Sequence, residues 1–238
     1  AVIIPVERGA GRLDVAKFPQ PETWADLLEA LRQLTDNQHQ YKTVVIDTLD
    51  AAEPLCFKHV SKEAGKADIE AFGYGKGYVA AGDEWRVFLA AIETLQAKRG
   101  VNVVLICHST IRSFHSPEGN DYDRWVLRLH EKSIGPLTKD WVETILFATH
   151  EDVAVKGADG KRLVGASTGN RHLRTRHGAA YEAGSRLDLP DPIPLYPEFG
   201  RSWGIFAAEA DLGAAGPAEL QMAVAKAAEG NPKAQEGI

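Results

Sequence analysis

Short apolar, β-branched runs alternate with amphipathic segments along most of the chain. Strands are predicted at VIIPV (2–6), KTVVID (42–47), VNVVLICHS (101–109) and TILFATH (144–150). Helical spacing of apolar residues predicts helices over 24–34, 51–63, 78–98 and 135–141. The second and third runs do not alternate between apolar and polar, so we expect both strands to be buried on both faces. This order predicts an α/β fold with a mostly parallel sheet and crossover helices.

Three segments depart from this alternation. The polar stretch RSFHSPEGNDYDR (112–124) predicts a long, mobile loop. EDVAVKGADGKRLVGAS (151–167) predicts an antiparallel hairpin with its turn at 157–160, which would extend the sheet. After residue 200 the chain is rich in Ala, Gly and Glu, so we expect a core over 1–200 and a partly helical or flexible tail over 201–238.

Composition narrows the class of protein only slightly. The chain has 238 residues, 44% apolar and 25% charged, with a net charge of −6, so any nucleic-acid contact would need a local basic patch. Cys56 and Cys107 lie far apart in apolar surroundings, which is typical of reduced thiols in a cytosolic protein. No apolar run reaches membrane-spanning length, and we expect no membrane association.

The glycine run GYGKGYVAAG (73–82) is similar in composition to a phosphate-binding loop. Such a loop needs a hydroxyl after its lysine, but Lys76 is followed by Gly77. The upstream SKEAGKADIEAF is polar and cannot be the buried strand that feeds a phosphate loop. The run is therefore no phosphate loop, and a flexible hinge before a helix is one explanation of it.

Polar residues follow three of the predicted strands, where open α/β sheets bind ligands. Asp47 could hold Mg²⁺ through its water shell, with Thr48 beside the nucleotide, or it could cap the following helix. Glu7 could activate a water, or it could be a solvated loop residue. His108 could contact a phosphate, or it could be a satisfied histidine at the sheet edge.

A basic segment, NRHLRTRHG, covers residues 170–178. Strand alternation predicts Arg174 and Arg176 on one face, where two guanidiniums would suit a phosphate. An edge strand guarded by charge would give the same pattern.

The segments VIIPVERGAGRLDV, YKTVVIDTLDAAEPL, GYGKGY, GVNVVLICHS and RHGAAYEAGSRLDLPDPIPL occur in an order that resembles the phage-type RecA-like ATP-binding proteins. That family includes the single-strand annealing ATPases of phage recombination systems. The resemblance covers about Val2 to Leu195. It rests on the order and spacing of the set, since no single motif is decisive.

The resemblance implies ATP and Mg²⁺ as cofactors and gives roles to the strand-end residues. Asp47 matches the Walker B acid, and Glu7 falls where the family keeps the glutamate that activates the attacking water. His108 matches the polar residue that senses the γ-phosphate. Arg174 and Arg176 are similar in placement to basic residues that reach a neighbouring subunit's nucleotide.

The resemblance also implies single-stranded DNA as a partner. GYGKGY falls in the place of the first DNA-facing loop, and residues 110–124 fall in the place of the second. The DNA-contact candidates are Tyr74, Lys76, Tyr78, Arg112 and Phe114. Stacking of a base on an aromatic side chain is worth ~1–3 kcal/mol.

One departure from the family is large, because the sequence contains no G-x-x-x-x-G-K-[ST] phosphate loop. We expect an N-terminally truncated RecA-like core whose first strand and phosphate loop are missing. The complete protein would be a DNA-dependent ATPase that forms a ring or filament in the cytoplasm of a phage or prophage host. The alternatives are a non-catalytic DNA-binding or assembly subunit that keeps the fold, and a structural subunit of a phage particle.

Overall fold

The computed structural model describes residues 1–117, 119–156, 163–196, 202, 204 and 206. They divide into two compact units, Ala1–Val142 and Glu143–Ile238, and each unit is described by itself. The predicted tail and the predicted hairpin turn at 157–160 lie outside the described residues. No helix in the described part of the chain is long and apolar enough to cross a membrane.

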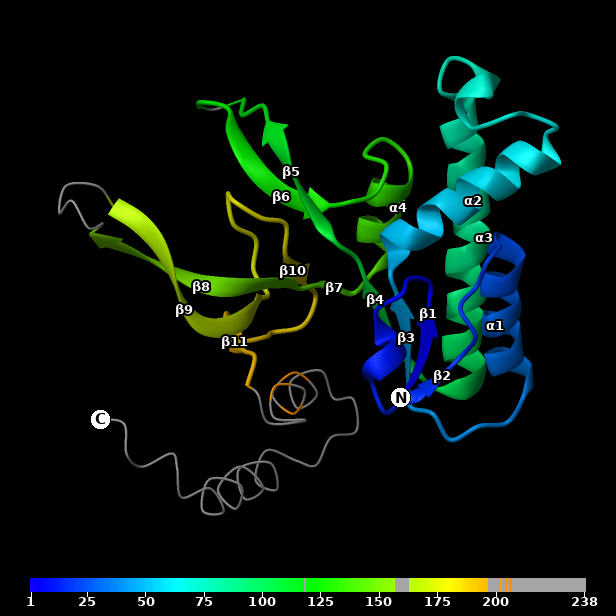
Figure 1. The fold of residues 1–238 in the computed structure, drawn as a ribbon, viewed down its shortest axis with the longest axis horizontal. Helices are drawn as coiled ribbons and strands as arrows, with labels where there is room; N and C mark the ends of the chain where they lie inside the picture. Colours follow the sequence, from blue (N-terminus) through cyan, green and yellow to red (C-terminus); the bar gives the residue numbers. More distant parts are fainter. Residues whose placement is uncertain (118, 157–162, 197–201, 203, 205, 207–238) are drawn as a thin grey trace. The chain divides into compact units, whose positions relative to one another are not determined.

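The first unit is built on a parallel four-stranded sheet with helices packed on it (Figure 1). Its strands are β1 (Val2–Pro5), β2 (Ala16–Lys17), β3 (Thr43–Asp47) and β4 (Asn102–Ile106), in the order β2-β1-β3-β4. The helices are α1 (Trp24–Asp36), α2 (Leu49–Glu63), α3 (Lys76–Arg99) and α4 (Ile134–Trp141), with 3₁₀ turns η1 (Ala10–Arg12) and η2 (Glu70–Phe72). This confirms the predicted mixed α/β architecture, which is consistent with a RecA-like fold.

The two faces of the sheet differ in burial. Ile4 and Ile46 are opposite each other in the register and are fully buried in one core with residues of α1, α2 and α3. On the opposite face, Val45 and Val104 are paired and only half-buried. The prediction that β3 and β4 are buried on both faces is therefore wrong, because the described part of this unit packs its helices against one face.

An aromatic cluster ties α1 to α3 in this core. Trp24 stacks on Trp85 with ring centroids 5.5 Å apart, and Phe88 packs against both rings. Both indole N–H groups are satisfied, since Trp24 donates to Glu84 at 2.7 Å and Trp85 donates to Thr138 at 3.0 Å. Large aromatic side chains can therefore be buried without an unpaired polar atom.

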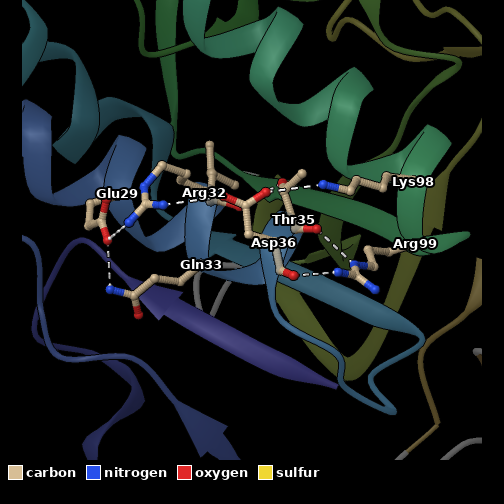
Figure 2. Close-up of polar contacts among 8 residues, drawn as sticks. Glu29, Arg32, Gln33, Thr35, Asp36, Lys98 and Arg99 are labelled. Atoms are coloured by element: carbon tan, nitrogen blue, oxygen red, sulfur yellow. Dashed lines mark hydrogen bonds and ion pairs between the residues drawn. The ribbon is translucent and has the colours of Figure 1, made fainter.

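The ends of α1 are held by side chains. Thr23 forms a capping box with Asp26, which satisfies backbone N–H groups of the first turn. At the other end, Arg99 of α3 donates to the backbone carbonyls of Thr35 and Asp36, both at 2.8 Å, while Lys98 pairs with the Asp36 carboxylate (Figure 2). These carbonyls have no partner inside α1, so α3 both packs on α1 and caps it.

The segment predicted as a mobile loop is instead an antiparallel hairpin, so that prediction is wrong. Its strands β5 (Ser109–Phe114) and β6 (Tyr122–Leu127) are continuously paired (Figure 1). Cross-strand pairs such as Ile111 with Trp125 and Phe114 with Tyr122 supply packing that a count of polar residues does not show.

The second unit contains antiparallel strands. The predicted strand 144–150 is divided between β7 (Thr144–Ile145), which pairs with β10 (Gly184–Ser185), and β8 (Phe147–Lys156). β8 pairs with β9 (Leu163–Arg174), which confirms the predicted C-terminal hairpin, and β11 (Ile193–Pro194) adds to β9. Because β9 ends at Arg174, the prediction that Arg176 shares a strand face with it is wrong.

Candidate functional site

The carboxyl ends of β1 and β3 bring two carboxylates together. The backbone N–H groups of Val6 and Glu7 both donate to the Asp47 carbonyl, at 2.6 and 3.1 Å, which fixes the chain after β1 against the end of β3. The Glu7 Oε1 and Asp47 Oδ2 atoms then lie 3.7 and 3.8 Å from the position that a Cβ on Gly9 would occupy. Two predicted site residues therefore converge on one glycine.

Thr48 completes this group. Its hydroxyl is buried and donates to Glu7 Oε2 at 3.3 Å, so one carboxylate oxygen is taken and Oε1 is the one that faces Gly9. The N-cap of α2 is Thr48, whose side chain makes no capping hydrogen bond to the first turn of the helix. The alternative interpretation of Asp47 as the helix cap is therefore wrong.

Negative charge is concentrated at this point. Burial raises the pKa of Asp47 above its ordinary value, and the neighbouring Glu7 carboxylate raises it further, while the charge of His108 lowers it. A carboxylate that is both desolvated and next to another carboxylate is stabilised by a cation. The pair therefore favours binding of a positive ion between or beside these oxygens.

Asp50 forms a second polar centre, which the sequence analysis missed. Its side chain is 5% exposed, in the first turn of α2. It accepts from the His108 backbone N–H at 3.0 Å and from Arg128 Nε at 2.9 Å, and Arg128 Nη2 also donates to it. Burial alone would raise the pKa of Asp50, but these hydrogen bonds outweigh it and hold the pKa at about 2.

His108, at the end of β4, joins this centre. Its Nδ1 lies 3.2 and 3.1 Å from the two Asp50 oxygens and 3.1 Å from Arg128 Nη2. The "DTLD" sequence gave a signal for Asp50, because an acid in the first turn of a helix after a strand-end Asp is placed at the same edge. Arg128 had no comparable signal, since it follows a polar stretch whose composition predicts a loop.

The residues predicted to contact DNA lie in two places. Tyr74 is fully exposed at a positive φ of 52°, and Lys76 is the first residue of α3. Tyr78 instead stacks on His130 with ring centroids 3.9 Å apart, and its hydroxyl donates to Glu70.

In the hairpin, Arg112 pairs with Glu131 and donates to the Leu129 carbonyl at 3.1 Å, so its charge is engaged. Phe114 is 37% exposed and lies under the Arg124 guanidinium, 4.2 Å from the ring centroid. Arg112 is therefore engaged by its neighbours, and one face of the Phe114 ring is covered by Arg124.

Arg174 and Arg176 belong to the second unit. Arg174 is half-buried with its guanidinium 6.0 Å from the Tyr181 ring, and Arg176 lies 4.0 Å from the exposed Asp188. Thr175, Arg176 and His177 line a cavity of about 350 Å³ within this unit. The role predicted for these arginines at a neighbouring nucleotide stays a prediction.

Within the described ranges, no three His, Cys, Asp or Glu side chains are grouped to hold a metal ion directly.

Comparison with curated proteins gives no match, and comparison with solved structures gives none either. A family model described as an AAA domain matches residues 1–187, which include β1, β3, β4 and the whole carboxylate site. The chain therefore belongs to the AAA domain family, a class of nucleotide-binding ATPase domains.

Proposed function

We propose that this chain carries the carboxylate side of an ATP-hydrolysing site, with Glu7 as general base and Asp47 as the acid that holds the metal's water shell. The observation that carries the proposal is the convergence of Glu7 Oε1 and Asp47 Oδ2 on Gly9, at the carboxyl ends of neighbouring parallel strands. Membership of the AAA domain family supplies the nucleotide. The 238 residues contain no phosphate loop, so the proposal concerns this side of the site alone.

The donor set fits Mg²⁺. The Asp47 carboxylate and the Thr48 hydroxyl are hard oxygen ligands, and Mg²⁺ is usually held by one or two carboxylates while it keeps several waters. Contact through water agrees with the lack of a direct three-ligand group among the residues described. When bound with ATP, Mg²⁺ would neutralise charge on the phosphates.

The protein's own groups divide the remaining work. The Thr48 hydroxyl occupies Glu7 Oε2, which leaves Oε1 to accept the proton of a water positioned beside Gly9. A bound cation would offset both the burial of Asp47 and its repulsion from Glu7, which would favour the charged form.

The test is ATP hydrolysis by the full-length protein, with and without Mg²⁺. Glu7→Gln should lower kcat by about 10²–10⁴-fold, because it removes the base but keeps the shape. Asp47→Asn should abolish the Mg²⁺-dependent rise in melting temperature that ADP produces, which is a readout independent of turnover. Glu63→Gln, which changes an exposed carboxylate at the end of α2, is the matched control. If Glu7→Gln hydrolyses ATP as fast as Glu63→Gln, the assignment is wrong.

We further propose that the partner is single-stranded DNA, in a phage recombination or replication module, with assembly into a ring or filament. Support comes from exposed aromatic rings, with Tyr74 and Phe114 in the two predicted segments and Trp125 directly after the second. Aromatic faces stack on unpaired bases irrespective of sequence.

Fluorescence anisotropy with labelled oligo-dT tests this partner. Tyr74→Ala should weaken binding by ~1–3 kcal/mol, and affinity should fall as salt is raised. Val79→Ala, at another exposed apolar position nearby, should leave it unchanged. If oligo-dT binds equally well with and without ATP, and ATP is not hydrolysed, the non-catalytic DNA-binding subunit is favoured. If oligo-dT does not bind at all, DNA is not the partner.

A further inference from the structure

The two ends of the β5–β6 hairpin meet at one buried carboxylate. His108 immediately precedes β5 and Arg128 immediately follows β6, and both side chains contact Asp50. The Arg128 backbone N–H also donates to the His108 carbonyl at 2.9 Å, which closes the base of the hairpin. Asp50 itself is in the first turn of α2, three residues after Asp47.

The contacts also define how the His108 ring is held. Both Asp50 oxygens lie within hydrogen-bond distance of Nδ1, and a lone pair on Nδ1 would face them unfavourably. Nδ1 therefore carries a proton and donates to Asp50, and Arg128 Nη2 approaches because it shares the same acceptor. Of the two His108 ring nitrogens, only Nδ1 has a hydrogen-bond partner among the described residues. Nε2 is therefore the ring nitrogen available to a ligand.

We propose that Asp50 is a positioning residue of the site. Its carboxylate holds Nδ1 of the His108 ring, which leaves Nε2 without a contact to Asp50, and it anchors both ends of the β5–β6 hairpin to the edge of the sheet that holds Glu7 and Asp47. This inference rests on the proposed ATPase function for its kinetic consequence only. The contacts of Asp50 with His108 and Arg128 would then connect a ligand on the hairpin to a nucleotide at Glu7 and Asp47.

The geometry explains why one carboxylate can do this. A carboxylate has about four lone-pair sites, and Asp50 receives the His108 backbone N–H, His108 Nδ1–H and two N–H groups of Arg128. An Asn at this position has one acceptor oxygen and no charge, so it cannot satisfy the same four donors.

The experiment compares Asp50→Asn and Arg128→Gln with wild type. Arg128 is 55% exposed, so its replacement keeps the test valid if the buried Asp50 variant does not fold. Arg86→Gln, which breaks an exposed ion pair with Asp83, is the matched control. Amide hydrogen exchange over 109–127 and the ¹⁵N shifts of the His108 ring are measured first, since neither depends on turnover.

We expect both variants to speed hairpin exchange by about tenfold or more, and the Nδ1–H signal of His108 to weaken, while Arg86→Gln changes neither. In hydrolysis assays Asp50→Asn should lower kcat by about tenfold with KM little changed, and oligo-dT should no longer stimulate it. Wild-type exchange and wild-type ring shifts in both variants would overturn the positioning role. If the wild-type protein does not hydrolyse ATP, the proposed function fails, and exchange and ring shifts alone decide the role of Asp50.

Discussion

Gly9→Ala separates the function of the carboxylate pair from the stability of the fold. Gly9 has a negative φ of −122°, so the backbone does not have the left-handed conformation that disfavours a Cβ. The added methyl would lie 3.7 Å from Glu7 Oε1 and 3.8 Å from Asp47 Oδ2, which is ordinary van der Waals contact. It would not clash, but it would occupy the space that both carboxylates face.

Two effects of opposite sign follow from this geometry. Replacing glycine at a compatible φ stabilises the fold by about 0.4–1 kcal/mol, because the unfolded chain loses freedom. A water that bridges the two carboxylates would be displaced by a group that cannot hydrogen-bond, at a cost of ~1–3 kcal/mol in binding of the magnesium nucleotide. That cost corresponds to about 5- to 150-fold weaker binding.

The assay is calorimetric titration of Mg-ADP together with urea unfolding of the same protein. Gly11→Ala is the control, since a Cβ at Gly11 meets nothing within 4 Å and the residue lies in the same loop. We expect both variants to be at least as stable as wild type and only Gly9→Ala to bind weakly. Equal binding by the two variants would refute the placement of the ligand between Glu7 and Asp47.

Three further changes test the fold around the site. Gly77→Ala should destabilise the protein by ~1–3 kcal/mol in urea unfolding, because its Cβ would lie 2.3 Å from the Ile69 carbonyl; unchanged stability would contradict this close approach. Arg99→Gln should cost about 1.5–3 kcal/mol through the loss of two charge-assisted hydrogen bonds to the last carbonyls of α1, and Arg86→Gln no more than about 0.5 kcal/mol. The Asp50 pKa is lowered from 3.8 to about 2, so its stabilisation is complete above pH 3.8 and is lost as the pH falls through about 2. Acid titrations of Asp50→Asn should lack this loss, and an identical acid transition would contradict the assignment.

The elements that could be predicted from sequence are those whose signal is local. β1 and β3 coincide with short apolar runs, and α1 begins at Trp24, where the predicted helix begins. The hairpin β5–β6 was missed because its stability comes from cross-strand pairs such as Phe114 with Tyr122, which are separated by a polar turn. Polar content predicts exposure, and an exposed segment can still be a paired strand.

The site divides in the same way. Strand-end position identified Glu7, Asp47 and His108, because parallel strands bring their carboxyl ends to one edge. Arg128 is 78 residues from Asp50 along the chain, so only the folded hairpin brings them together. An arginine that pairs with a carboxylate far away in the sequence leaves no spacing pattern. A residue at the end of a predicted strand does leave one.

The glycine run at 73–77 shows why composition alone does not identify a phosphate loop. Gly73, Tyr74 and Gly75 all have positive φ, and Gly75 is the N-cap of α3. Gly77 is buried where the Ile69 carbonyl approaches too closely for any side chain. Glycine is required here for a left-handed turn and for a close backbone contact, which are the same two properties that a phosphate cradle uses. A buried strand before the run, and a hydroxyl after the lysine, distinguish the two uses. In this chain a polar segment and η2 precede the glycine run. The run leads into α3 and leaves Tyr74 exposed.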